Sequence, residues 1–194
     1  MAINSFSGAN RFLSNFFPSP IRLYGIDFPT VEHAYQASKF RDTATRLTIA
    51  AAPTPGHAKR AGRHFGPDLE YLGPDWESKK VEVMRQCLEL KFQIPHLREM
   101  LLDTGDEELI EGNHWGDRFW GVCAGTGENW LGRLLMERRQ IVRGYKMEDE
   151  QEYPSIESAL VVLDDALRDA YDKKSADELQ AAIDILKKVT GQHV

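Results

Sequence analysis

Apolar residues recur at helical spacing in several separate stretches of the chain. Between residues 76 and 92, Val81, Met84, Leu88 and Phe92 fall three or four positions apart, which predicts one long helix. The same spacing, read with proline and glycine as stop signals, predicts further helices at about 31–41, 42–52, 95–102 and 130–143, and a short basic helix at 57–63. Gly144 is expected to end the helix at 130–143.

Short strands are expected between these helices. Residues 21–24 and 26–28 flank Gly25, a pattern typical of a hairpin. Thr30 then follows as a suitable N-cap for the helix beginning at residue 31. Residues 109–111 and 119–123 are two further candidate strands.

The last fifty residues have a pattern of their own. The acidic segment 148–152 is typical of a linker, and helices are predicted at about 155–172 and 175–190, with apolar faces that suit an antiparallel helical hairpin. We therefore predict two domains, residues 1–144 and 145–194. The predicted fold class is α+β and mainly α-helical: a compact single domain with a small antiparallel β-sheet, built from the N-terminal strands and 119–123, plus the C-terminal helical hairpin.

Charge divides the chain at the same place. Residues 1–143 carry 18 Lys+Arg and 18 Asp+Glu, whereas residues 144–194 carry 6 and 12, so the net charge of −6 over 194 residues lies entirely in the last segment. This balance disfavours a general attraction to nucleic acid, although it leaves room for a local basic groove.

Composition and motifs together indicate the cellular compartment and which cofactors to expect. Two cysteines without metal-ligand spacing, no signal-peptide pattern and no apolar stretch long enough for a bilayer predict a cytoplasmic protein with no membrane partner. No set of His, Cys, Asp and Glu has convincing metal spacing, and the glycine-rich segments match neither a Walker A loop nor a dinucleotide-binding motif. We expect no metal and no cofactor.

A first candidate site lies on the helix that begins at residue 31. Glu32, Gln36 and Lys39 share one helix face, and Glu32 sits in the first turn, where the helix dipole favours a carboxylate. An ionised carboxylate suits a general base or a stabiliser of developing positive charge. The alternative is an ordinary first-turn carboxylate beside a solvated lysine.

A second candidate is the loop 112–121, in which glycines separate aromatic and polar residues. Trp115 and Trp120 offer stacking surfaces for flat rings, and Asp117 is a second carboxylate. The alternative is a tryptophan-rich core loop held by tight turns.

Two further features suit a phosphate. The turn 125–129 ends at Asn129 and leads directly into a helix, whose first N–H groups can bind an anion, although Asn129 is also a plain N-cap. Lys59, Arg60, Arg63 and His64 form a basic cluster that Lys39 can join, although a short basic helix is often just a solvated face.

Six blocks together carry a family resemblance. They are residues 12–17 (FLSNFF), 28–40 (FPTVEHAYQASKF), 57–63 (HAKRAGR), 76–92, and the closing blocks WGD at 115–117 and GTGENWLGRLLM at 125–136. Their order and spacing over about residues 6–142 resemble the YbiA-like family, also called NADAR. The more aromatic segment 118–124 departs from the glycine-rich version in some members, and the acidic extension lies outside the resemblance.

The resemblance implies an N-glycosidase that cleaves a ribose C1–N bond. Family substrates include phosphoribosylamino-pyrimidine intermediates of riboflavin synthesis, and other members remove ADP-ribose from guanine in nucleic acid. By similarity, Glu32, Trp115 and Asp117 carry over as the core of the site, and the substrate contacts are Asn15, Gln36, Lys39, Arg60, Arg63 and Asn129, with Trp120 as a second stacking surface.

Three functions follow from this resemblance. The leading one is hydrolysis of a small phosphorylated ribosyl substrate to free base and ribose 5-phosphate, with Glu32 stabilising positive charge on the ribose or activating water. The second is an ADP-ribosyl hydrolase, for which nucleic acid is a partner only as an ADP-ribosylated substrate. The third is a non-catalytic binder of NAD or ADP-ribose. The predicted hairpin also offers a surface for a homodimer contact.

Overall fold

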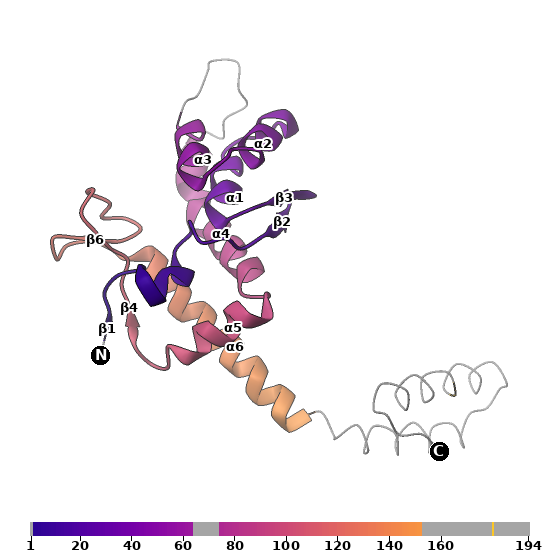
Figure 1. Cartoon of the computed structure of the whole chain (residues 1–194), viewed down its shortest axis with the longest axis vertical. Coiled ribbons are helices and arrows are strands. Elements are labelled where there is room, and N and C mark those ends of the chain that lie inside the picture. The colour runs from indigo at the N-terminus through magenta and orange to yellow at the C-terminus, as the bar shows by residue number, and fades with distance from the viewer. Residues whose placement is uncertain (1, 64–73, 153–179, 181–194) are drawn as a thin grey trace. The chain divides into compact units, whose positions relative to one another are not determined.

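The computed structural model describes residues 2–63, 74–152 and 180 (Figure 1). The chain divides into two compact units, Met1–Arg143 and Gly144–Val194. The first unit is built mainly of helices with a few short strand pairs, which confirms the predicted class, a mainly helical α+β fold. The predicted hairpin helices at 155–172 and 175–190 lie, except for Gln180, outside the described residues.

The hairpin predicted around Gly25 is confirmed. Strands β2 (Ile21–Leu23) and β3 (Ile26–Phe28) pair antiparallel. The two turn residues, Tyr24 and Gly25, have φ angles of 53° and 74°. Positive φ at both positions is what a tight two-residue hairpin turn requires. The hairpin delivers the chain directly to the start of the next helix.

Helix α1 (Val31–Ala37) begins where the sequence predicts and ends earlier. The Thr30 hydroxyl accepts a hydrogen bond from the His33 N–H at 3.3 Å, which caps the first turn. All seven helical residues are buried. The Ser38 hydroxyl donates to the Ala34 carbonyl at 2.7 Å, and the helix stops there rather than at residue 41.

Four more helices follow α1 before the strand β4. Their bounds are α2 (Thr43–Ala50), α3 (Pro55–Ala61), α4 (Pro74–Lys91) and α5 (Pro95–Asp103). Three of them lie close to the predicted ranges, but α3 begins and ends earlier than the predicted 57–63. Thr54 caps α3 and Pro55 occupies its first turn, where a missing N–H costs nothing. A 3₁₀ helix, η1 (Gly8–Leu13), was not predicted.

The strands do not form the single sheet expected from the sequence. Besides the hairpin, β1 (Ala2–Ile3) pairs parallel with β4 (Glu108–Leu109), and β5 (Gly112–Asn113) pairs parallel with β6 (Val122–Cys123). The prediction that 119–123 joins the N-terminal strands is therefore wrong. A Cβ on Gly112 would lie 2.2 Å from the Asn4 carbonyl oxygen, so glycine lets the backbone at the start of β5 approach the backbone that follows β1.

Helix α6 (Trp130–Glu152) is longer than predicted. It runs through Gly144, so the expected stop at this glycine and the expected linker at 148–152 are both wrong. A Cβ on Gly144 would meet nothing within 4 Å, and one glycine costs an exposed helix only about 1 kcal/mol. Strong helix formers on both sides of Gly144 outweigh that cost.

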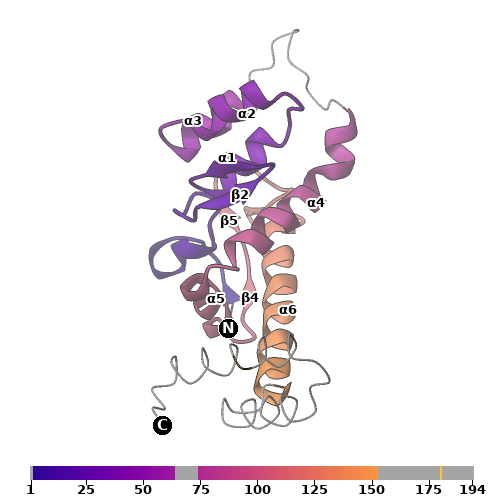
Figure 2. The same ribbon diagram turned by 90° about the vertical axis from the view of Figure 1, so that its right-hand side faces the viewer.

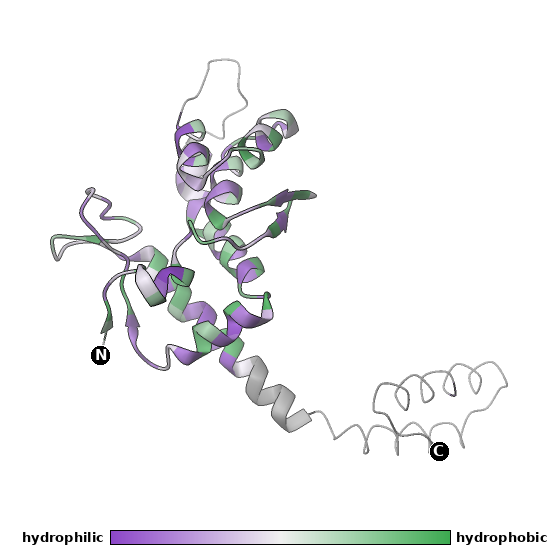
Figure 3. Ribbon diagram, in the orientation of Figure 1, coloured by the Kyte–Doolittle hydropathy of each residue, from purple (hydrophilic) through white to green (hydrophobic). Residues whose placement is uncertain are grey.

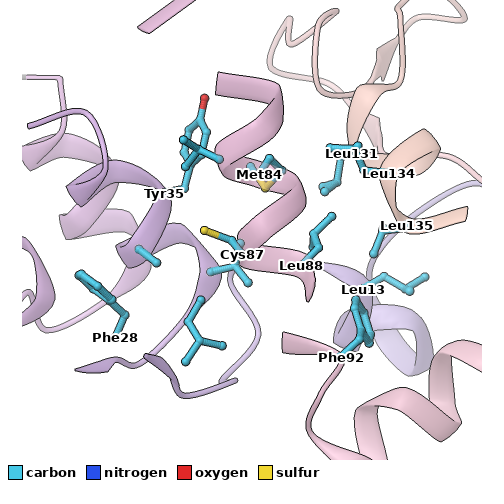
Figure 4. Packing of buried hydrophobic residues seen from close by; sticks show 14 of the residues in the cluster. Leu13, Phe28, Tyr35, Met84, Cys87, Leu88, Phe92, Leu131, Leu134 and Leu135 are labelled. Carbon is cyan, nitrogen blue, oxygen red and sulfur yellow. The ribbon is translucent and has the colours of Figure 1, made fainter. Parts of the chain in front are cut away.

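Helix α4 runs through the middle of the first unit. Figures 1 and 2 place α1, α2 and α3 together at one end and α5 with β4 at the other. In Figure 4, Cys87 of α4 lies toward α1, whereas Met84 and Leu88 face Leu131 and Leu134 of α6. Figure 3 shows polar and apolar residues interspersed along these helices, and the buried apolar residues of α1, α4, α5 and α6 belong to one core.

No helix within the described part of the chain is both long enough and apolar enough to cross a bilayer.

Candidate active site

A cavity of about 500 Å³ opens where four distant parts of the chain meet. The N-terminal segment with η1, helices α1 and α3, the α4–α6 core and the loop after β4 each contribute to its wall. The lining residues are Phe6, Ser7, Gly8, Arg11, Ser14, Asn15, Phe16, Glu32, Tyr35, Gln36, Lys39, Lys59, Arg63, Met84, Glu111, Trp115, Asp117, Trp120 and Leu131.

Most of the candidate residues from the sequence meet in this cavity. Those that line it are Asn15, Glu32, Gln36, Lys39, Arg63, Trp115, Asp117 and Trp120. Arg60 and Asn129 are absent from the lining. Arg60 is exposed on α3, next to a residue that does reach the cavity.

Glu32 is the most buried charged residue of the cavity wall, with 5% of its surface exposed. The Gln36 side-chain amide, one helical turn along the same face, donates a hydrogen bond to Glu32 Oε1 at 2.8 Å. Burial raises the pKa of Glu32, while Gln36, Lys59, Lys39 and Arg63 oppose that rise. The expectation that the helix dipole favours ionisation is thus reversed, because loss of solvent outweighs it.

Three side-chain oxygens of lining residues are buried without a hydrogen-bond partner in the described residues: Asn15 Oδ1, Gln36 Oε1 and Glu111 Oε2. The Asn15 backbone carbonyl accepts a hydrogen bond from the Glu32 N–H at 3.0 Å, so Asn15 and Gln36 are both neighbours of Glu32. Buried acceptors without partners are uncommon in folded proteins.

Cations line the side of the cavity formed by α1 and α3. Lys39 donates to the Gly62 carbonyl at 3.3 Å, and burial is the main cause that lowers its pKa to about 8. Lys59 lies 5.8 Å from the centre of the Phe16 ring, and Arg63 follows one turn later. All three favour the charged form of Glu32. Together they are suited to an anionic group on a ligand.

Aromatic rings form another part of the wall. Trp120 meets Tyr35 edge to face, with ring centres 5.5 Å apart, and Tyr35 also packs against Trp76 at 5.1 Å. Trp115 is different, because 58% of its surface is exposed although it lines the cavity. An exposed indole at a cavity mouth can stack on a flat ring.

Asp117 is tied into the loop that carries these tryptophans. Its Oδ1 accepts hydrogen bonds from the backbone N–H groups of Phe119 at 3.1 Å and Trp120 at 2.9 Å. The Asn113 side chain brackets it, donating to the Asp117 carbonyl at 2.7 Å and accepting from the Asp117 N–H at 3.0 Å. Asp117 therefore positions Trp120 as well as reaching the cavity.

The Asn129 side chain is hydrogen-bonded to the backbone and does not line the cavity. Its Oδ1 accepts from the Glu111 N–H at 3.0 Å, and its Nδ2 donates to the Leu109 carbonyl at 2.9 Å. No residue of the turn 125–129 is among the described lining residues, so the phosphate site considered for this turn is not at the cavity. Gly127 serves close packing, since a Cβ there would lie 2.1 Å from the Gly121 carbonyl oxygen, whereas Gly125 has open space around it and a φ of 76°.

Sequence reasoning missed three contributors to the site. Glu111 was assigned only to a strand, although it stands at the entry to the glycine- and tryptophan-rich loop. Tyr35 lies on the face of α1 already singled out, and the segment 6–11 carries no distinctive motif. Lys59, recognised only as part of a basic cluster, lines the cavity, while His64 lies outside the described residues.

The cavity thus combines a deeply buried carboxyl with cations and aromatic rings that lie close together, since Lys39 Nζ is 5.8 Å from the centre of the Tyr35 ring. Within residues 2–63, 74–152 and 180, no three His, Cys, Asp or Glu side chains are grouped as metal ligands would be. Burial strengthens electrostatic effects on any charge that develops in a bound ligand. The arrangement suits hydrolysis through a positively charged transition state.

Comparison with known proteins gives consistent matches. Residues 4–143 match the NADAR domain family. The chain is 40% identical over 142 residues to N-glycosidase YbiA of Escherichia coli, covering 71% of this chain and 86% of that protein. An N-glycosidase of Nostoc punctiforme is 42% identical over 136 residues, covering 67% and 84%.

Two more similarities extend the comparison. The NMR structure of the E. coli protein YbiA superimposes with a TM-score of 0.66 at 39% identity, over 76% of this chain and 87% of that one. A riboflavin biosynthesis protein of Vibrio vulnificus is 40% identical over 131 residues, which cover 66% of this chain and 35% of the larger protein.

Proposed function

Because the chain belongs to the NADAR family and is an N-glycosidase, we propose that its substrate is a phosphoribosylamino-pyrimidine intermediate of riboflavin synthesis. Water would replace the nitrogen at ribose C1, giving the free base and ribose 5-phosphate. The observation that carries the proposal is the position of Glu32, buried in a cavity whose neighbouring wall is cationic.

Glu32 supplies the central chemistry in this proposal. Breaking a ribose C1–N bond builds positive charge on the sugar ring, and a carboxylate beside C1 stabilises that charge. Because burial raises its pKa, Glu32 is also a stronger base toward water than an exposed glutamate. The Gln36 hydrogen bond at 2.8 Å fixes which way the carboxylate points.

The rest of the cavity suits the rest of the substrate. A 5′-phosphate would pair with Lys39, Lys59 and Arg63. The ribose would lie beside Asn15 and Gln36, which both line the cavity next to Glu32. The pyrimidine would then lie toward the loop, against Trp115, with Asp117 positioning water or contacting the ribose. The naming of a similar Vibrio protein for riboflavin biosynthesis supports this choice of substrate.

A substrate panel tests the proposal. Wild-type protein is incubated separately with phosphoribosylamino-pyrimidine, its dephosphorylated riboside, NAD, ADP-ribose and DNA bearing ADP-ribosylated guanine, and released base is followed by chromatography. We expect the highest kcat/KM for the first compound. Loss of the phosphate should lower kcat/KM by roughly 10- to 100-fold, because charge-assisted hydrogen bonds contribute about 1.5–3 kcal/mol.

The other outcomes of the panel are equally informative. Preferred release of ADP-ribose from DNA would replace the proposed function with ADP-ribosyl hydrolysis. Binding of NAD or ADP-ribose without release of any base would show a binding module instead.

A further inference from the structure

Glu111 is a second carboxyl group in the cavity wall, on a different element from Glu32. It lies between β4 and β5, just before the loop that carries Trp115, Asp117 and Trp120. Its backbone is fixed on both sides. The N–H donates to Asn129 Oδ1 at 3.0 Å, and the carbonyl accepts from the Val122 N–H at 2.8 Å. The side chain therefore leaves a rigid anchor.

The Glu111 carboxyl is poorly supported as an anion. Its Oε2 is buried and has no hydrogen-bond partner among the described residues. Burial, and next the charge of Asp117, raise the pKa of Glu111 to about 7, while Lys59 on α3 opposes the rise. A buried carboxyl with no donor to support its negative charge favours the neutral form, whose proton a bound group can accept.

We propose that Glu111 is the general acid of the reaction and protonates the departing nitrogen. This inference rests on the proposed function for the reacting bond, but it applies to whichever ribosyl substrate the enzyme cleaves. Glu111 and Glu32 line the same cavity from different elements, and Glu111 precedes the loop whose Trp115 would stack on the base. The two carboxyls divide the acid and base roles between them.

Two proton transfers accompany the cleavage of the C1–N bond. The C1–N bond breaks with its electron pair on nitrogen, which takes the proton from the Glu111 carboxyl. Water forms the new C1–O bond and loses a proton to the Glu32 carboxylate. Solvent then removes the proton from Glu32 and returns one to Glu111. The net change is the addition of one water molecule.

The test is Glu111→Gln, assayed on the substrate that wild-type protein cleaves best in the panel. Glutamine keeps the size and shape of the side chain but cannot transfer a proton. We expect kcat to fall by about 10²- to 10⁴-fold. For wild-type protein, activity should fall as the pH rises through about 7, because the acid form of Glu111 is lost. This decline near pH 7 should be absent in the variant, which should keep only the later decline as Lys39 loses its charge near pH 8.

Glu108→Gln is the matched control, because Glu108 is exposed on the neighbouring strand β4. It should keep wild-type kcat and the wild-type pH profile. A Glu111→Gln variant with wild-type kcat and an unchanged decline near pH 7 would overturn the assignment.

A second readout does not depend on turnover. In protein labelled with ¹³C at the glutamate carboxyl carbon, one resonance should titrate near pH 7 in wild type and in Glu108→Gln, and be missing from Glu111→Gln. If no such resonance is lost, Glu111 does not hold a proton at neutral pH and the inference fails. If wild type cleaves no phosphoribosylamino-pyrimidine, only the proposed substrate fails, and both measurements still decide the role of Glu111.

Discussion

Lys91 has no exposed surface, although lysine is seldom fully buried. Its Nζ donates to the Ser14 carbonyl at 2.8 Å and lies 5.3 Å from the centre of the Phe92 ring. Burial lowers the pKa of Lys91 to about 7. Ser14 lines the cavity and precedes Asn15, so this buried lysine supports the cavity wall from behind.

Lys91→Met should change how stability depends on pH. The pKa of Lys91 falls from 10.5 to about 7 on folding, so between these pH values the unfolded chain binds more protons than the folded one. The free energy of unfolding in wild type should therefore gain up to about 1.4 kcal/mol per pH unit from this residue as pH rises from 7 to 9.5. Urea unfolding at several pH values measures this slope.

The slope should disappear in Lys91→Met. It should persist in Lys79→Met, which alters an exposed lysine of the same helix. Equal slopes in all three proteins would show that Lys91 does not titrate in this range.

Sequence reasoning identified residue types better than residue environments. The position of Glu32 one residue past the start of α1 follows from Thr30 and the helical pattern. Its burial does not, because the groups that cover it come from α3 and the N-terminal segment, which are distant in sequence. Local dipole arguments then gave the wrong direction for its pKa.

Between elements, the contact of α1 with the end of α3 controls the site most directly. A Cβ on Gly62, the residue that follows α3, would lie 2.1 Å from Gln36 Oε1 and 2.9 Å from Gln36 Cβ. The Gly62 carbonyl also accepts a hydrogen bond from Lys39. Only glycine lets the two helices come this close, and the contact holds Gln36 beside Glu32.

Gly62→Ala should therefore damage the site through packing alone. The added methyl group must displace Gln36 or move α3 away from α1, which costs about 1–3 kcal/mol of stability. Losing the Gln36–Glu32 alignment should lower kcat at least about 10-fold, since a small displacement of a catalytic group has large effects. Urea unfolding and turnover on the same preparation measure both effects.

Gly56→Ala provides the comparison within α3. Its Cβ would meet only Thr54 Oγ1, at an ordinary contact distance of 3.7 Å, so stability and turnover should stay near wild type. Similar losses in both variants would mean that the α1–α3 contact is not special.

Elements defined by neighbouring residues were predictable, and those defined by distant partners were not. The β2–β3 hairpin and the start of α1 depend on Gly25 and Thr30, which are visible in the sequence. The strands in the parallel pairs β1–β4 and β5–β6 are not connected by a tight turn that the sequence could reveal. Each strand is also too short to show an alternation of apolar and polar residues. Helix α6 passes through Gly144 because a glycine favours a helix end without imposing one.

At the scale of the molecule, the family domain and the cavity coincide with the electrically neutral part of the chain. The family match covers residues 4–143, and the described lining residues lie between Phe6 and Leu131. The excess negative charge belongs to residues 144–194. The net charge of the whole chain therefore does not describe the cavity, which Lys39, Lys59 and Arg63 line.

The assembly of the cavity explains why the sequence yielded much of the site but not all of it. The sequence places Asn15, Glu32, Arg63 and Asp117 in separate motifs. The fold brings all four to the wall of one cavity. The motif around Asn129 predicts a ligand contact, but the Asn129 side chain instead accepts a hydrogen bond from the Glu111 N–H. The position of Glu111 in the cavity wall is clear only from the three-dimensional structure.

The most direct test of the account is a single-turnover comparison of wild type with Glu32→Gln on phosphoribosylamino-pyrimidine, with enzyme in excess. Free base is followed with time, and substrate binding is measured separately by calorimetry. Glutamine keeps the shape of Glu32 but can neither stabilise positive charge nor accept a proton. We predict binding within a few-fold of wild type and a rate of base release lower by about 10²- to 10⁴-fold. Release of base at the wild-type rate by a folded Glu32→Gln protein would contradict the account.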